Sequence, residues 1–342
     1  MFNKKGYSNP MQKKASIVIA TGLFPPNIGG PAKYASMLYK GLEAQGIPVR
    51  LVQWKIEKRL PTLLRYVIFF FRLLMKCHGA TSIVCFDATS VGFPAALVSS
   101  ITGIPFVVRV GGDSTWEAYV NRTGNPLSLK TFYTNIQTLS FKESMLIKMT
   151  AFVLRNAKYV VVNTSWYGAI IEKTYSVSQE KIVVIENVFE PKSAQNPEGN
   201  FMLLASNRNI PLKNNKMLET VVANVQKKGI HVELYTTPFT HQKLPHLMKN
   251  IYATAVVSFS EVSPNLVLEG LEYGKPFILT KETGLHERFH ACGVFIDPTN
   301  QASIEEGLQN LIENYDTYKQ KAQSILYVHT EVDIVKKYLS IV

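Results

Sequence analysis

The chain has 342 residues, 46% of them hydrophobic, so it is long enough to bury two cores of ordinary domain size. Its three cysteines show no spacing typical of a disulfide framework or a zinc site, which fits a reducing cytoplasm. The formal charge of +12 lies in the first half, because residues 1–190 carry 22 Lys+Arg against 10 Asp+Glu (22 − 10 = +12) and residues 191–342 carry 15 of each (15 − 15 = 0). This asymmetry indicates an anionic partner for that half: a membrane surface, an acidic acceptor or nucleic acid.

Residues 1–14 carry four lysines ahead of an apolar stretch at residues 15–24, a pattern that superficially resembles a secretory signal. The stretch ends in Pro-Pro-Asn-Ile-Gly-Gly and lacks a small-residue cleavage site. We therefore interpret residues 1–14 as a flexible basic tail before a first buried strand.

Short β-rich runs then alternate with helical stretches, which predicts parallel sheets covered by helices on both faces. In the first half we expect strands at residues 16–21, 49–54, 83–86, 106–110, 159–163 and 182–185, and helices at 32–45, 61–77, 93–101, 141–154 and 165–175. A polar segment with two prolines around residues 187–200 predicts a linker. Strands resume at residues 201–205, 232–235, 254–259, 277–280 and 294–296.

A glycine pair, Gly29 and Gly30, follows the first predicted strand and precedes a helix. Glycines leave the backbone uncovered, and Pro31 suits the first helical position, so a phosphate or sugar could approach the amides closely. Most such pairs only make the turn, and the run is neither a dinucleotide fingerprint nor a P-loop.

The predicted helix within residues 61–76 is unusually apolar, and its cations Arg65, Arg72 and Lys76 fall on one stripe. Its apolar run is shorter than the roughly 20 residues that cross a bilayer. Two interpretations stay open. Residues 55–76 could lie on the inner face of a membrane, with the cations on headgroups, or the helix could pack on the sheet with its arginines solvated.

A pair of cations, Arg208 and Lys213, lies just beyond the first strand of the second half. An arginine fork and a lysine at this spacing can converge on a diphosphate. Alternatively, Arg208 and Lys213 are simply two loop cations exposed to solvent.

Two acids, Glu261 and Glu269, are separated by seven residues that include Asn265 and Leu266. Asn265 follows Pro264 and opens an apolar helical pattern, so a helix should begin there with its free N–H groups aimed into the preceding loop. Such a helix start can hold an anion while nearby carboxylates accept hydroxyl protons. The pattern predicts a nucleotide-sugar site, although an isolated pair of acids is more often a loop glutamate and an exposed helix glutamate.

Together these motifs resemble the retaining glycosyltransferases of the GT-B fold, specifically family 4, of the bacterial surface-polysaccharide type. The resemblance covers nearly the whole chain and is carried by Gly29-Gly30, residues 160–165, residues 185–188, the Arg208/Lys213 pair, the Glu261/Glu269 pair, and residues 280–287 and 293–298. It implies an α/β GT-B architecture, in which two Rossmann-like doubly wound domains face a central cleft. Residues 1–190 would bind the acceptor, residues 191–200 would link the domains, and residues 201–342 would bind the nucleotide sugar, with the last helix packing back on the first domain.

The resemblance implies transfer of a sugar from a UDP- or GDP-type donor to a hydroxyl of a saccharide or lipid-linked acceptor, with retention of configuration. Arg208 and Lys213 would neutralise the leaving diphosphate with amides near Asn265 and Leu266, Glu269 would accept from ribose hydroxyls, and Glu261 would contact the donor sugar. Neither a metal nor another cofactor is expected.

The chain departs from the family after the predicted strand at residues 106–110, where many members carry a histidine and this sequence reads Arg109-Val-Gly111-Gly112-Asp113. Asp113 is the nearest candidate for a polar group at the reacting centre, with Trp116 and Glu117 shaping the acceptor side. A loop-capping aspartate is an equal alternative.

We therefore expect a cytoplasmic, metal-independent enzyme of surface polysaccharide or glycolipid synthesis, peripheral on the inner membrane face. Nucleic acid is not expected as a partner, because the basic half shows none of the usual recognition motifs. A non-catalytic binding protein of the same fold and a nucleotide-sugar epimerase remain as alternatives.

Overall fold

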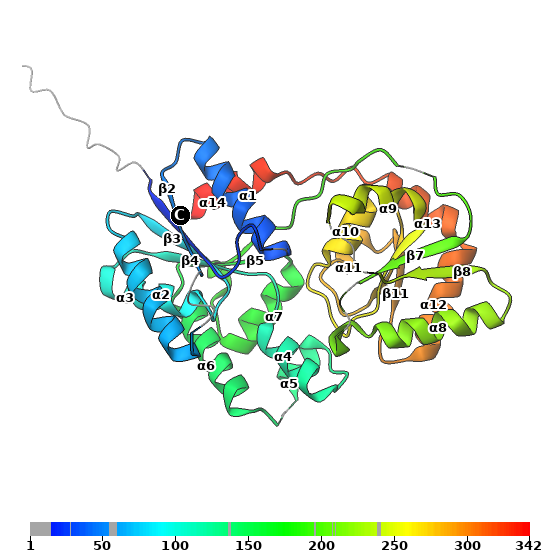
Figure 1. Cartoon of the computed structure of the whole chain (residues 1–342), viewed down its shortest axis with the longest axis horizontal. Helices are drawn as coiled ribbons and strands as arrows, with labels where there is room; N and C mark the ends of the chain where they lie inside the picture. The colour runs from blue at the N-terminus through cyan, green and yellow to red at the C-terminus, as the bar shows by residue number, and fades with distance from the viewer. Residues whose placement is uncertain are drawn as a thin grey trace, which may run out of the picture.

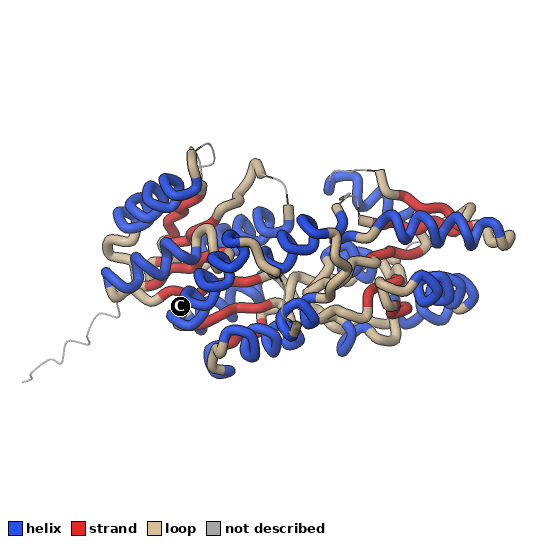
Figure 2. The backbone as a smooth tube through the Cα atoms, turned by 90° about the horizontal axis from the view of Figure 1, so that it is seen from below, coloured by secondary structure: helices blue, strands red, loops and turns tan. Residues whose placement is uncertain are grey.

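The computed structural model describes residues 15–342 except 28, 55–59, 136–137, 195, 207, 209 and 238–240. The predicted tail at residues 1–14 therefore lies outside the described residues. The chain forms two lobes, each built on one parallel sheet (Figure 1). Helices lie on both sides of the strands in each lobe (Figure 2).

The first lobe contains six strands, β1 Ile17–Thr21, β2 Val49–Gln53, β3 Ser82–Phe86, β4 Phe106–Val110, β5 Tyr159–Val162 and β6 Ile182–Val184. Its helices are α1 Gly30–Ala44, α2 Thr62–Lys76, α3 Gly92–Thr102, α4 Ser114–Thr123, α5 Leu129–Thr134, α6 Phe141–Asn156, α7 Ser165–Tyr175 and the short 3₁₀ turn η2 Gln179–Lys181. The sheet order is β2-β1-β3-β4-β5-β6, and the side chains of β1, β3 and β4 are buried throughout. Burial on both faces explains why these strands are continuously apolar rather than alternating.

The second lobe contains β7 Phe201–Ala205, β8 Val232–Tyr235, β9 Ala253–Val256, β10 Phe277–Thr280 and β11 Gly293–Ile296 in the order β11-β10-β9-β7-β8. Its helical elements are η3 Pro211–Lys213, α8 Asn215–Lys227, η4 His241–Lys243, α9 Leu244–Asn250, α10 Asn265–Glu272, α11 His286–Phe289, α12 Gln301–Glu313 and α13 Tyr315–Gln323. The predicted architecture of two parallel-sheet α/β domains is therefore confirmed.

The last helix, α14 Glu331–Ile341, leaves the second lobe and packs on α1 of the first (Figure 1). Its apolar face joins the first lobe's core through Ile334, Val335 and Tyr338. A Cβ on Gly41 of α1 would lie 2.4 Å from Val335 Cγ2, so the two helices meet closely at a glycine. The chain thus crosses between the lobes twice.

Two helices of the first lobe, α4 and α5, were not among the predicted elements. Asp113 caps α4, Gly124 ends it in the left-handed conformation, and Ser128 caps α5. The predicted strand at residues 254–259 is also too long, because β9 ends at Val256. Beyond it the chain continues as a buried loop that leads to Glu261.

Among the described helices, none is both long enough and apolar enough to cross a membrane.

Candidate functional site

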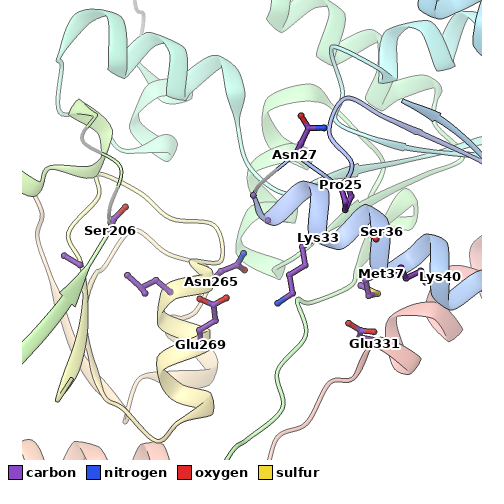
Figure 3. A pocket seen from close by; sticks show the side chains of 14 residues that line it. Pro25, Asn27, Lys33, Ser36, Met37, Lys40, Ser206, Asn265, Glu269 and Glu331 are labelled. Atoms are coloured by element: carbon purple, nitrogen blue, oxygen red, sulfur yellow. The ribbon is translucent and has the colours of Figure 1, made fainter. Parts of the chain in front are cut away.

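The lobes enclose a cavity of about 550 Å³, a size typical of small-molecule sites. Its wall combines the glycine loop and α1, the ends of β3 and β4, and residues of α10 from the second lobe. A neighbouring cavity of about 640 Å³ shares Gly30, Lys33, Met37, Asn265, Glu269 and Glu331 with it (Figure 3). Ligands of parallel α/β sheets bind at such strand ends.

The glycine loop lies close to the start of α10, where a larger residue at position 30 would require the Asn265 side chain to shift. A Cβ on Gly30 would lie 2.9 Å from Asn265 Nδ2, and Gly29 has φ 135°, a conformation that favours glycine. Gly29 and Leu266 also line the larger cavity. The structure therefore brings Gly29, Gly30, Asn265 and Leu266 together at one opening between the lobes.

The helix predicted at Asn265 begins there, and no side chain caps it. Asn265 itself is exposed, and its Oδ1 accepts from Asn187 Nδ2 at 3.0 Å. An uncapped helix start presents backbone N–H groups and the positive end of the helix dipole to the opening, which favours an anion there.

Glu269, one turn into α10, faces Lys33 of α1 across the opening (Figure 3). Burial raises the pKa of the Glu269 carboxyl to about 7; Lys33 and Lys192 oppose that rise, and Glu272 adds to it. Glu269 can therefore change its protonation state near neutral pH. Only the ionised carboxylate can accept hydrogen bonds from the hydroxyls of a ligand with both of its oxygens, because the protonated carboxyl uses one oxygen as a donor.

Lys213 and Glu261 form an ion pair of 2.5 Å, and each side chain is only 14% exposed. Ser258 Oγ donates to the same Glu261 oxygen at 2.6 Å. The Glu261 backbone is fixed as well, because its N–H donates to the Glu282 carbonyl and its own carbonyl accepts from the Gly284 N–H. In the ligand-free protein the lysine charge is thus neutralised by the glutamate.

Arg208 is exposed on the loop after β7, and its N–H donates to Ser206 Oγ at 3.4 Å. Glu117, on α4 of the first lobe, lines the 550 Å³ cavity and interacts electrostatically with Arg208 and Lys213. Burial raises the pKa of Glu117, Lys213 and Arg208 oppose the rise, and Glu261 and Asp113 add to it. These charges therefore lie near enough to interact, although Arg208, Lys213 and Glu261 do not line the two cavities themselves.

Asp113 serves as the N-cap of α4. Its Oδ1 accepts from the N–H groups of Thr115 and Trp116, and its Oδ2 accepts from the Tyr133 hydroxyl at 2.7 Å. The side chain is 7% exposed and does not line either cavity between the lobes. These contacts are those of a capping aspartate, the alternative given in the sequence analysis, and a catalytic role for Asp113 stays a prediction.

Sequence reasoning did not single out Lys33 or the role of Arg109 at the cavity, and it noted Asn187 only within residues 185–188, without a role. Lys33 lies one turn into α1, and no motif signals it. The described residues contain no group of three or more His, Cys, Asp and Glu side chains able to hold a metal ion. The expectation of a metal-independent reaction stays a prediction.

Comparison with known proteins places this geometry in a familiar fold. Residues 191–325 match the family model described as "Glycosyl transferases group 1". The chain is similar to sucrose-phosphate synthase from Thermosynechococcus elongatus, with a TM-score of 0.70, 12% identity and coverage of 95% of this chain and 98% of that one. It is also similar to HepE from Anabaena, solved with UDP and glucose, with a TM-score of 0.68, 15% identity and the same coverage.

A putative UDP-N-acetylglucosamine 2-epimerase from Listeria monocytogenes is similar too, with a TM-score of 0.59, 13% identity and 95% of each chain covered. No curated protein matches the chain. At these identities the structural likeness establishes the GT-B fold, and the family match in the second lobe supports a glycosyltransferase.

Proposed function

We propose that the protein is a retaining, family 4 glycosyltransferase that moves a sugar from a UDP- or GDP-type donor to a hydroxyl of a saccharide or lipid-linked acceptor. One observation carries this proposal: α10 begins uncapped at Asn265, opposite Gly30 and Lys33, at an interlobe cavity of about 550 Å³. Backbone amides and cations suit a diphosphate, and Glu269 suits the hydroxyls of its attached sugars.

In the proposed reaction the bond between the anomeric carbon and the diphosphate oxygen breaks, and the acceptor hydroxyl oxygen bonds to that carbon on the same face. The hydroxyl proton is transferred to the departing diphosphate. Arg208 and Lys213 stabilise the negative charge that develops on the diphosphate, together with the α10 amides. Lys213 must exchange Glu261 for a phosphate oxygen, which leaves Glu261 able to contact the donor sugar.

The direct test is a thermal-shift panel of UDP, GDP and ADP sugars, followed by a turnover assay with the sugar that stabilises the protein most. We expect Arg208→Ala to lower turnover roughly 100-fold. Lys216→Ala, an exposed lysine on α8, is the matched control and should leave turnover unchanged. Binding without turnover supports the non-catalytic alternative, and interconversion of free donors without an acceptor supports an epimerase. The proposal fails if no nucleotide sugar binds.

We also propose that the first lobe contacts an anionic membrane surface, which would place the enzyme at the inner membrane face in surface polysaccharide or glycolipid synthesis. Five apolar side chains of α2 are exposed: Leu63, Leu64, Val67, Phe71 and Met75. Four of them are spaced by four residues and form one stripe, while Phe69 and Leu73 are buried below it. Residues 55–59, the start of the segment predicted to touch the membrane, lie outside the described residues.

Helix α6 extends this surface with exposed Phe141, Met145 and Phe152. Helix α3 lies between α2 and α6 and contacts both. The ring contacts Tyr66–Phe93 (6.1 Å) and Phe93–Phe152 (5.9 Å) make the connection continuous. Exposed Lys76, Lys142 and Lys148 supply positive charge for acidic headgroups.

The two arginines of α2 contact other groups of the protein, although the predicted stripe would present them to headgroups. Arg65 stacks over Trp54 and donates to the Leu60 carbonyl, and Arg72 donates to the Gln53 carbonyl. Headgroup attraction therefore rests mainly on the lysines.

Co-sedimentation with phosphatidylglycerol vesicles tests the surface, with phosphatidylcholine vesicles as the neutral comparison. We expect Phe71→Ser with Met75→Ser to abolish binding to the anionic vesicles, and Phe141→Ser with Met145→Ser to weaken it. Leu326→Ser is the control, because Leu326 is 94% exposed in the second lobe. Unchanged binding in both stripe variants overturns the assignment.

A further inference from the structure

Arg109, at the end of β4, is a buried cation in the wall of the 550 Å³ cavity. The residue is 8% exposed, and it forms no ion pair with any carboxylate of the described residues. Buried charges are ordinarily paired, because an ion loses several kcal/mol of hydration when it leaves water. An unpaired guanidinium in a cavity wall therefore needs an explanation.

The guanidinium is held in one position. Its Cζ lies 3.7 Å from the centre of the Tyr34 ring, and Nη2 donates to Asn187 Oδ1 at 2.9 Å. Asn187 is held in turn by Asn265 and Ser263 of the second lobe. Arg109 is thus positioned by both lobes, while its buried Nε has no acceptor in the part of the chain that the structure describes.

Gly111 makes room for this arrangement. A Cβ at that position would lie 2.7 Å from Arg109 Nη1, so a larger residue at 111 would require the guanidinium to shift.

A second polar group near the cavity also lacks a partner. Asn163, which is 3% exposed, lines the same cavity, and its Oδ1 accepts from no described residue. Its Nδ2 donates to the Gly111 carbonyl at 3.4 Å, which places it beside the Arg109 site. Other buried polar atoms of the described residues also lack a partner, but Arg109 and Asn163 line the same cavity, so a ligand there could satisfy both of them.

We propose that Arg109 binds an oxyanion, a carboxylate or a phosphate, carried by the sugar substrate in this cavity. The inference rests on the proposed function and extends it to the substrate class. A guanidinium matches the geometry of such a group, whereas the hydroxyls of a neutral sugar are served by carboxylates and amides. The anion can belong to the donor, as in a uronic acid, or to the acceptor, as in a sugar phosphate.

Two titration series distinguish these sources. The first compares UDP-glucuronic acid with UDP-glucose, and the second compares glucose 1-phosphate and glucuronic acid with methyl glucoside, with and without UDP. We expect wild-type protein to bind the anionic member of one series at least about tenfold more tightly. Arg109→Gln should abolish this preference, and Arg109→Lys should restore part of it.

Arg50→Gln is the matched control for a structural arginine. Arg50 lies in the same lobe and donates to the His78 carbonyl and to Ser16 Oγ, away from the cavity. Its loss can lower the melting temperature but should leave the ratio of anionic to neutral affinity unchanged. A purely structural Arg109 would behave in the same way.

Equal affinity of the wild-type protein for anionic and neutral ligands in both series overturns the assignment of Arg109. If UDP still binds and Arg208→Ala weakens it, the proposed function survives that failure. If no nucleotide binds at all, the proposed function fails, and the nucleotide-free series with glucose 1-phosphate still decides the role of Arg109.

Discussion

The ion pair between Lys213 and Glu261 belongs to the ligand-free protein, and the proposed reaction would break it. The 2.5 Å ion pair holds both side chains before the donor binds, and the proposed reaction requires Lys213 to turn to the diphosphate. Competition between a carboxylate and a phosphate for one ammonium group means that the two residues should have opposite effects on UDP affinity.

We expect Lys213→Met to weaken UDP binding about tenfold or more, because a charge-assisted contact is lost. Glu261→Gln should leave UDP binding equal or tighter, since Lys213 is freed, yet lower turnover roughly 100-fold. Calorimetry with UDP and a turnover assay measure the two effects separately. The double variant controls for destabilisation from leaving one member of a mostly buried pair alone. Weaker UDP binding in Glu261→Gln would contradict the exchange.

Glu269 predicts a pH dependence. Its pKa of about 7 in the folded protein exceeds its ordinary value of 4.5, mainly because the carboxyl is buried. Only the ionised form accepts from two hydroxyls, so affinity for a UDP-sugar should fall by up to about tenfold per pH unit as the pH drops below 7. Glu269→Gln should remove this dependence, and a UDP-sugar is the right probe because its diphosphate does not titrate in that range.

The same shift has a consequence for stability. The Glu269 carboxyl binds its proton more tightly in the folded state of the wild type than in the unfolded state. The stability that this protonation contributes is therefore complete below pH 4.5 and is lost as the pH rises through 7. At pH 8 Glu269→Gln should therefore melt roughly 2–4 °C higher than wild type, and at pH 4.5 the two should coincide. A pH-independent difference between the two melting curves would show that another effect of the substitution dominates.

At the scale of elements, two variants of Asp113 distinguish a helix cap from a catalytic group. Asp113→Asn keeps the Oδ1 acceptor for the first N–H groups of α4, whereas Asp113→Ala removes it and leaves the Tyr133 hydroxyl without that acceptor. We expect the asparagine variant to retain turnover within about threefold, and the alanine variant to lose about 1–2 kcal/mol of stability. Urea unfolding and turnover are the measurements. A large loss of turnover in Asp113→Asn would indicate a catalytic role for Asp113.

The strands were predictable because burial on both faces leaves a direct mark on composition. Four of them, β4, β7, β8 and β10, have the predicted bounds, and the start of α10 was found from Pro264-Asn265. The candidate site residues that the sequence singled out likewise lie in short motifs, a glycine pair, a cation pair and an acid pair, of which the structure places Gly29, Gly30 and Glu269 at the cavities. Helices α4 and α5 escaped because their sequences are polar and their start is set by single capping residues, Asp113 and Ser128.

Contacts between the lobes could not be read from the sequence. Lys33 faces Glu269, and Asn187 joins Arg109 to Asn265, although these partners are 78 to 236 positions apart in the chain. Such pairs depend on how the two sheets face one another, and no spacing along the chain encodes that arrangement. Composition did show the exposed apolar helix α2, but only the packing shows that α6 continues its surface.

At the scale of the whole molecule, Arg288 of α11 bridges the lobes. Its Nη2 lies 2.8 Å from Glu186 Oε1, beyond the end of β6, and its guanidinium stacks on Tyr327 at 3.9 Å. Lys281 and Asp297 form a 2.9 Å pair of similar exposure that lies wholly in the second lobe. The two pairs therefore provide a matched comparison between closure of the lobes and stability within one lobe.

Exposed ion pairs contribute only about 0–1 kcal/mol, so neither Arg288→Ala nor Lys281→Ala should change the melting temperature much. Arg288→Ala should nevertheless shift the ligand-free protein toward an open arrangement. We expect a larger radius of gyration in X-ray scattering and about two- to fivefold weaker donor binding, because opening would separate the residues of the two lobes that line the cavity. A saturating donor should return the radius to the wild-type value. Indistinguishable scattering curves for the two variants would show that this bridge does not govern closure.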